Sequence, residues 1–189
     1  MRDSRGNAAL EFAFVAPAFI ALVVAIFQIA FIFLAQQQLE TATEGAARYI
    51  LTGQAQNGAW SAATFRQKTC ALLPAFMSCS NLYVDINTVT SYAQASTSQP
   101  LMSASTYTVT TSSAAGATCT TSSVAAGSAD ANGITAAFNY CTGTQGAIVQ
   151  LRLLYIWPTL SAPLGFTLAN GGTNQRYLLS TSVLKTEGY

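Results

Sequence analysis

The feature that most constrains this chain is an uninterrupted apolar run from Phe12 to Leu34. Its 23 residues include a single conventionally polar side chain, that of Gln28. An α-helix rises about 1.5 Å per residue, so a helix of this length matches a bilayer hydrocarbon core of about 30 Å. The run therefore predicts one membrane-spanning helix.

Basic residues flank this run asymmetrically. Arg2 and Arg5 precede it, and the next Lys or Arg lies well beyond Leu34. Because cytoplasmic flanks are enriched in Lys and Arg, we expect the N-terminus in the cytoplasm and the residues after Leu34 across the membrane. A cleaved secretory signal is the alternative. Its apolar part is normally about 7–15 residues long, and Phe33 stands two positions before Ala35, where an Ala-x-Ala-like cleavage site needs a small residue.

Glu11 stands directly against the apolar run, where an ionised carboxylate is costly and normally has a partner. A position at the headgroup level, or in the first helical turn, is one interpretation. A second interpretation starts from Gly6. A cut after Gly6 makes Asn7 the new N-terminus, with its ammonium at the membrane level of Glu11. In an assembly of staggered helices, each Glu11 carboxylate then neutralises a neighbour's ammonium.

Residues 5–17 read Arg-Gly-Asn-Ala-Ala-Leu-Glu-Phe-Ala-Phe-Val-Ala-Pro. They resemble the processing region of type IV pilin-like proteins, and more closely the TadE-like family of the tight adherence (Tad, or Flp) pilus systems. Ala-Arg-Tyr at 47–49 also resembles the family, and so, more loosely, do residues 155–158 and 184–189. The chain ends in Lys-Thr-Glu-Gly-Tyr where the family leads us to expect Arg-Asn-Glu-Pro-aromatic, so the C-terminal resemblance is partial.

This resemblance implies a function and a set of partners. A prepilin peptidase would cut between Gly6 and Asn7, and Glu11 and Phe12 would act in assembly with other pilin subunits on a Tad pilus assembly platform. The chain would be a minor pilin or pseudopilin that is assembled into, primes or caps a Tad-type type IV pilus used in surface adhesion. A minor role is expected because the major Tad pilin is little more than the helix.

The apolar pattern continues beyond the membrane segment. Its members recur at steps of four, three, four and three, as one face of a helix requires: Ala35, Leu39, Ala42, Ala46 and Tyr49. This thin face is expected to pack on its own domain or on neighbouring helices. Pro17 predicts a kink near residues 13–17, unless it marks the helix start.

The remaining sequence predicts an α+β domain, and the whole chain a type IV pilin-like fold. A short second helix is expected within 58–77. Strands are expected, in an antiparallel sheet of about three to five, at 82–89, 106–111, 147–157 and 175–184. The rest of 90–135, rich in Ser, Thr, Ala and Gly, is expected to form exposed loops. The predicted division is a cytoplasmic leader at 1–6, a long helix at 7–53 that spans the membrane at 12–34, and a periplasmic or extracellular domain at 54–189.

Four cysteines follow the apolar run, at Cys70, Cys79, Cys119 and Cys141. An even number beyond a membrane segment suggests two disulfides in an oxidising compartment, whereas a cytosolic chain would keep four thiols. Three pairings are possible. Cys70–Cys79 with Cys119–Cys141 is preferred because each bond closes a local loop.

Composition argues against several functions. Only 8% of residues are charged and the net charge is +1, so no nucleic-acid partner is expected. The chain has no histidine, the commonest general base and transition-metal ligand. No phosphate-binding loop or zinc-ligand spacing is present. We therefore expect no enzyme activity, no catalytic residues, no metal, no cofactor and no small-molecule substrate.

Two other classes stay open. A permanently membrane-anchored periplasmic binding or envelope-assembly protein would keep residues 1–6 and would not need Glu11. A secreted domain would lose the whole apolar run. Under the leading hypothesis the chain is first a single-pass protein of the bacterial inner membrane and then part of a pilus at the cell surface, so the mature N-terminus separates the three classes.

Overall fold

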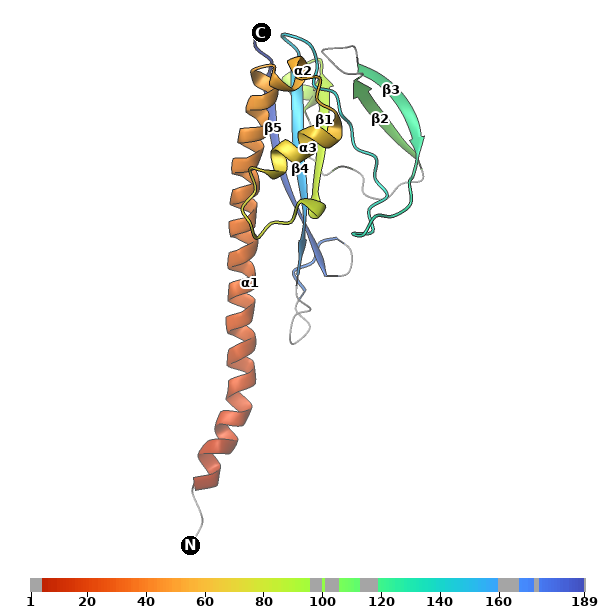
Figure 1. The fold of residues 1–189 in the computed structure, drawn as a ribbon. Helices are drawn as coiled ribbons and strands as arrows, with labels where there is room; N and C mark the ends of the chain where they lie inside the picture. The colour runs from red at the N-terminus through yellow and green to blue at the C-terminus, as the bar shows by residue number, and fades with distance from the viewer. Residues whose placement is uncertain are drawn as a thin grey trace.

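A computed structural model of the chain describes residues 5–95, 100, 106–112, 119–159, 167–171 and 174–188. Its longest element is α1 (Arg5–Leu51), a helix of 47 residues that begins ahead of Pro17 and continues through it. The N-terminal half of α1 stands free, whereas its C-terminal half lies along a small sheet (Figure 1). The predicted α+β, pilin-like class is confirmed. The expected kink at Pro17 stays a prediction.

The domain that follows α1 alternates short helices with strands. Its helical elements are α2 (Gln54–Asn57), α3 (Ala62–Cys70), η1 (Cys79–Asn81) and η2 (Tyr92–Gln94). Its strands are β1 (Leu82–Val89), β2 (Thr106–Ser112), β3 (Cys119–Ala125), β4 (Ile148–Pro158) and β5 (Gln175–Lys185).

β4 is the central strand of an antiparallel sheet with the order β1-β4-β5. Its register places Leu151 opposite Ile86 on one side and Ser182 on the other. A strand with both faces covered needs apolar side chains in both directions, and β4 provides them. Its most completely buried side chains are those of Val149, Leu151, Leu153, Leu154, Tyr155 and Ile156.

α1 packs its predicted apolar stripe on one face of this sheet. Ala35, Leu39 and Ala46 are fully buried and share one core with β4 residues such as Leu151. Tyr49, the last member of the stripe, is half-buried and packs its ring edge-on against that of Trp60. Small residues along the stripe let the helix backbone approach the sheet closely. Within one chain, the stripe therefore serves the protein's own domain.

α3 closes the end of the core beside the C-terminal turns of α1. Its N-cap is Ser61, whose hydroxyl accepts a hydrogen bond from the Thr64 amide at 3.2 Å. Phe65, on the first turns of α3, is fully buried among the rings of Tyr49 and Tyr140. The short helix expected within 58–77 is thus present.

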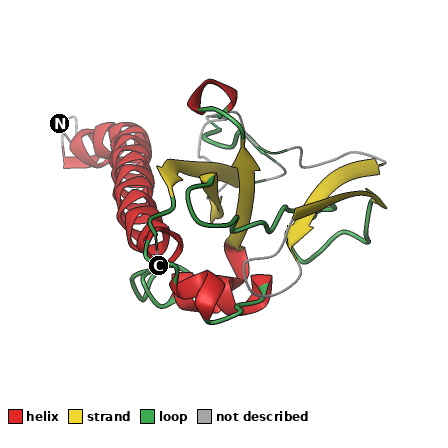
Figure 2. Cartoon of the chain, turned by 90° about the horizontal axis from the view of Figure 1, so that it is seen from above, coloured by secondary structure: helices red, strands yellow, loops and turns green. Residues whose placement is uncertain are grey.

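One sequence-based expectation is wrong. Residues 119–125 were expected to lie in an exposed loop, but they form β3, which pairs with β2 from Thr106↔Ala125 to Ser112↔Cys119. Apart from Cys119, every residue of β3 is exposed, so no apolar alternation marks it in the sequence. Its strand conformation comes from backbone pairing with β2. This two-stranded ribbon lies on the side of the sheet away from α1 (Figure 2).

Candidate functional site

The N-terminal half of α1 presents an apolar surface that the rest of the described chain does not cover. From Leu10 to Phe27 its large apolar side chains are mostly exposed, with Phe12 at 73% and Phe14 at 76%. α1 is long and apolar enough to cross a membrane, and only 17% of its most apolar window is buried. A helix in the core of a soluble domain would be mostly buried. This surface therefore requires another apolar environment.

Among the described residues, the domain meets the apolar run of α1 near Gln28. The side chain of Gln28 lies beside Trp157, Pro158 and Thr159, at the end of β4. One turn further along, Ile32 is 7% exposed. The one polar residue of the apolar run therefore faces the protein. About 27 Å of helix, from Leu10 to Phe27, lies below this contact, and its large side chains are mostly exposed among the described residues. This length is close to the thickness of a hydrocarbon core.

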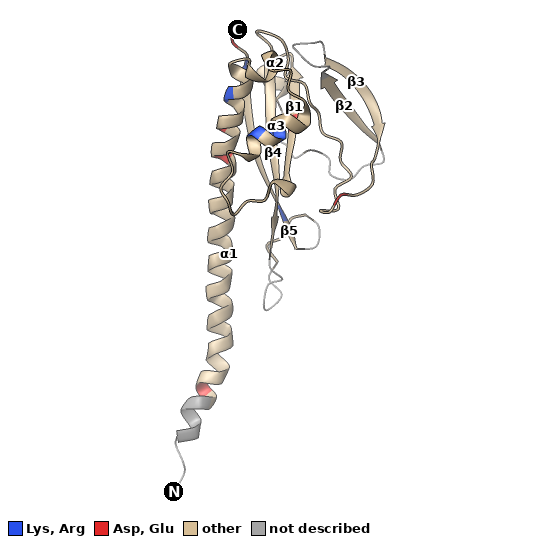
Figure 3. Cartoon of the chain, in the orientation of Figure 1, with Lys and Arg blue, Asp and Glu red and all other residues tan. Residues whose placement is uncertain are grey.

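Charge is nearly absent from the free half of α1. Figure 3 shows the described basic and acidic residues mainly along the upper half of the molecule, with one acidic position near the N-terminal end of the helix. That acidic residue is Glu11, which is exposed, and the adjacent Phe12 is exposed as well. Gly6 and Asn7 lie in the first turns of α1. The predicted cleavage and assembly residues thus lie together at one end of a bare apolar helix.

Residues 6–48 match the family of TadE-like proteins. The resemblance predicted from the sequence is confirmed over this segment. No curated protein and no solved structure matches the chain.

The TadE-like segment coincides with most of α1. It begins at Gly6 and contains Asn7, Glu11, Phe12 and Pro17. It ends at residue 48, in the C-terminal turns of the helix. The similarity therefore covers the free apolar half of α1 and, apart from Tyr49, the stripe that packs on the sheet, and the α+β domain lies outside it.

Both disulfides lie in the domain outside the TadE-like segment. Cys70 is bonded to Cys79 and Cys119 to Cys141, with Cα–Cα distances of 5.6 and 5.8 Å. This is the pairing favoured by the short loops. The first bond joins the end of α3 to η1, and the second joins β3 to the segment that runs beside β1.

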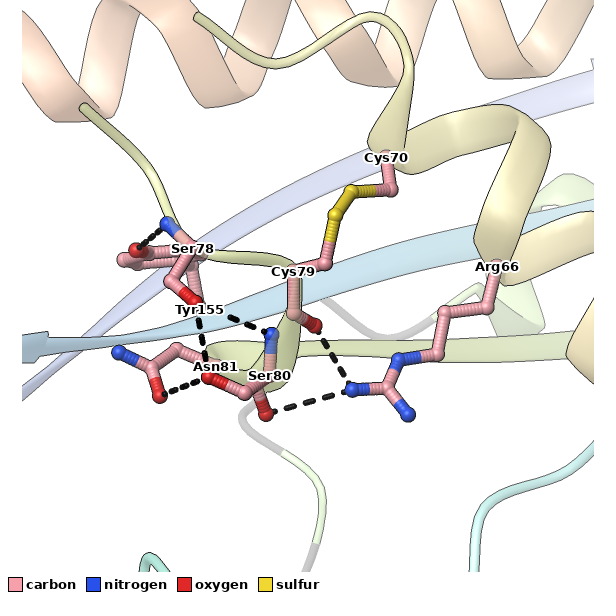
Figure 4. Close-up of a disulfide and its surroundings, with 7 residues drawn as sticks. All are labelled: Arg66, Cys70, Ser78, Cys79, Ser80, Asn81 and Tyr155. Atoms are coloured by element: carbon pink, nitrogen blue, oxygen red, sulfur yellow. Dashed lines mark hydrogen bonds between the residues drawn. A yellow bond between two sulfur atoms is a disulfide. The ribbon is translucent and has the colours of Figure 1, made fainter. Parts of the chain in front are cut away.

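Hydrogen bonds hold the loop that the first disulfide closes (Figure 4). Arg66 on α3 donates to the carbonyl of Cys79 at 2.7 Å and to that of Ser80 at 3.2 Å. The Ser78 amide donates to the hydroxyl of Tyr155 on β4 at 2.8 Å. Burial raises the pKa of Tyr155, against the smaller opposing effect of the bond from Ser78. The loop is therefore fixed both to α3 and to the sheet.

A buried ion pair is a polar cluster that sequence reasoning missed. Asp85 on β1 pairs with Arg152, which lies opposite it on β4. The second Asp85 oxygen accepts hydrogen bonds from the backbone and the side-chain amide of Asn139, both at 2.8 Å. The carboxylate is only 4% exposed. In the sequence Asp85 was one of several scattered acids, because only strand pairing brings it to Arg152.

A second polar cluster ties the loop before residue 134 to β1. Tyr83 donates its hydroxyl proton to Asp130, and the Asn132 side chain donates to the Tyr83 oxygen at 2.8 Å. The pKa of Asp130 is lowered overall. Partial burial acts to raise it, but hydrogen bonds from Tyr83 and from the amides of Ile134 and Asn132 outweigh this effect, together with the positive charge of Arg66. Burial raises the pKa of Tyr83 to about 12.

In both clusters the charged and polar side chains bond to one another, as expected of groups that stabilise the fold. Among the described residues, no group of three or more Cys, Asp or Glu side chains is placed to hold a metal ion. The region best suited to a function is therefore the exposed apolar half of α1 with Glu11 at its end.

Proposed function

We propose that this protein is a minor pilin or pseudopilin of a Tad-type type IV pilus system, and that it acts as a structural subunit, not as an enzyme. The observation that carries the proposal is the bare apolar half of α1. It lies inside the TadE-like segment, begins next to Glu11 and is continuous with a helix packed on a folded domain.

The proposed mechanism begins in the inner membrane. The free half of α1 spans the bilayer with its N-terminus in the cytoplasm, and the α+β domain lies in the periplasm. A prepilin peptidase cuts between Gly6 and Asn7. The new ammonium of Asn7 and the carboxylate of Glu11 then lie about one turn apart along the same helix, both at the cytoplasmic end of the apolar run.

Assembly moves the same helix into a second apolar environment. A Tad pilus assembly platform extracts α1 from lipid, and helices of neighbouring pilin subunits cover its exposed side chains. Each charge at the helix start is costly without a partner, so a Glu11 carboxylate on one subunit pairs with the Asn7 ammonium of the next. The α+β domain, held by its disulfides, then primes, caps or decorates a fibre used in surface adhesion.

The test combines N-terminal mass mapping with one substitution. The chain is expressed with and without a prepilin peptidase, and a mature form that starts at Asn7 is expected only with the peptidase. Glu11→Ala is expected to be cleaved normally and to be lost from sheared filaments. Glu44→Ala is the matched control, because Glu44 is an exposed acid on the same helix outside the apolar run.

Two results would contradict this proposal. An intact leader in the presence of active peptidase indicates a permanently anchored binding or envelope-assembly protein. A mature terminus beyond Leu34 indicates a secreted domain.

A further inference from the structure

A crevice of about 330 Å³ lies between α1 and the part of the domain nearest the free half of that helix. In Figure 1, β4 and β5 extend down beside the middle of α1 at this place. From α1 the crevice is lined by Ile29, Ile32, Phe33 and Gln36. Its other wall contains Leu168, Arg176, Tyr177 and Leu178.

Arg176 supplies the positive charge in this crevice. It lies on the same face of β5 as Leu178, a core residue two positions along the strand. Its Nη1 donates to the carbonyl of Leu168 at 3.0 Å. Its Nε is buried and has no hydrogen-bond partner among the described residues. A buried N–H donor without an acceptor is costly, and none of the residues that line the crevice is acidic.

The crevice lies at the depth where the apolar run ends. Ile29 and Phe33 belong to the predicted membrane span, and Gln36 is the first polar residue after it. Trp157, cross-strand partner of Arg176, and Tyr177 lie near the same end of the sheet. Trp and Tyr are enriched at membrane–water interfaces, and Arg directs its guanidinium toward the headgroups. The crevice therefore lies at the depth of the lipid phosphates.

We propose that this crevice binds one anionic glycerophospholipid of the leaflet that faces the domain. Its phosphate accepts a charge-assisted hydrogen bond from the guanidinium of Arg176, and one acyl chain follows the apolar wall at Ile29 and Phe33. The inference rests on the proposed membrane insertion of α1 and is independent of cleavage or filament assembly.

The experiment uses the full chain purified in a non-ionic detergent. Dioleoyl phosphatidylglycerol and dioleoyl phosphatidylcholine are added in equal amounts, and the lipid retained by the folded protein is counted by native mass spectrometry. We expect one molecule of phosphatidylglycerol to be retained with at least tenfold preference. Equal retention of the two lipids would overturn the proposal.

Two variants test the role of Arg176. Arg176→Gln is expected to abolish the preference. Leu168→Glu keeps the Leu168 carbonyl as acceptor but places a carboxylate beside the guanidinium, so it should abolish the preference as well. Lys185→Gln is the control, since Lys185 is an exposed cation near the other end of β5. If both crevice variants keep the preference, or if the control loses it equally, the proposal is wrong.

Two further arms separate the sources of failure. Inorganic phosphate in excess should displace the lipid no better than chloride at the same ionic strength; selective displacement would indicate a site for a free anion and would overturn the lipid assignment. Alkali-resistant sedimentation of the chain with membranes tests insertion of α1 separately. An inserted chain that shows no lipid preference refutes only the lipid site, whereas loss of insertion refutes the membrane step of the proposed function as well.

Discussion

Replacing Asp85 by Ala should be among the most destabilising single changes in this domain. The substitution removes the carboxylate that pairs with Arg152 and accepts two hydrogen bonds from Asn139. Arg152 is itself only 13% exposed, so the substitution leaves its charge in a poorly hydrated site. Removing one partner of a buried ion pair costs about 3–5 kcal/mol, mainly because the other charge loses its compensation.

The assay is urea unfolding of the full chain in a non-ionic detergent, followed by tryptophan fluorescence. Asp85→Asn is the matched variant, because an amide oxygen keeps an acceptor for Asn139 while the negative charge is lost. We expect Asp85→Ala to lower the free energy of unfolding by about 3–5 kcal/mol. Arg152→Leu combined with Asp85→Leu should be milder, because an apolar pair leaves no buried charge. A loss below about 1 kcal/mol for Asp85→Ala would show that solvent or other groups compensate Arg152, and would refute the reasoning.

Two other predictions concern the core and the alkaline limit of stability. Leu39 is fully buried between α1 and the sheet, so Leu39→Ala should lower the free energy of unfolding by about 2–5 kcal/mol in the same assay. The control Gln37→Ala, at an exposed position, should change this free energy little. Equal effects of the two substitutions would contradict the packing of α1 on the sheet. Burial raises the pKa of Tyr140 from 10.0 to about 12. As the pH rises above 10, this phenol therefore ionises in the unfolded chain before it ionises in the folded protein. The stability that it contributes is complete below pH 10 and is lost as the pH rises toward 12. Tyr140→Phe should therefore show a shallower fall in unfolding free energy over this pH range, and an unchanged slope would contradict the assignment.

Several elements of the fold were predictable because local patterns suffice to specify them. The apolar run and the helical stripe that follows it indicate one long helix, and α1 extends from Arg5 to Leu51. The apolar, β-branched stretches that became β4 and β5 were predicted within one or two residues of their bounds. In each case the segment's own side chains carry the pattern of burial.

Other features escaped prediction because they depend on partners distant in the sequence. β3 has almost no buried side chain, so its conformation follows from the backbone bonds of β2. Asp85 and Arg152 are brought together only by the register of β1 against β4. No local periodicity carries that information.

The sequence by itself determined the membrane-length helix, the position of Glu11 at its start and the α+β class, since hydropathy and periodicity are properties of contiguous residues. Only the tertiary structure decided where the domain meets α1. That contact places Gln28 against the end of β4 and Arg176 beside the last turns of the apolar run. Depth along a helix is set by the packing of distant segments against it, so the crevice that Arg176 lines becomes visible only in the folded chain.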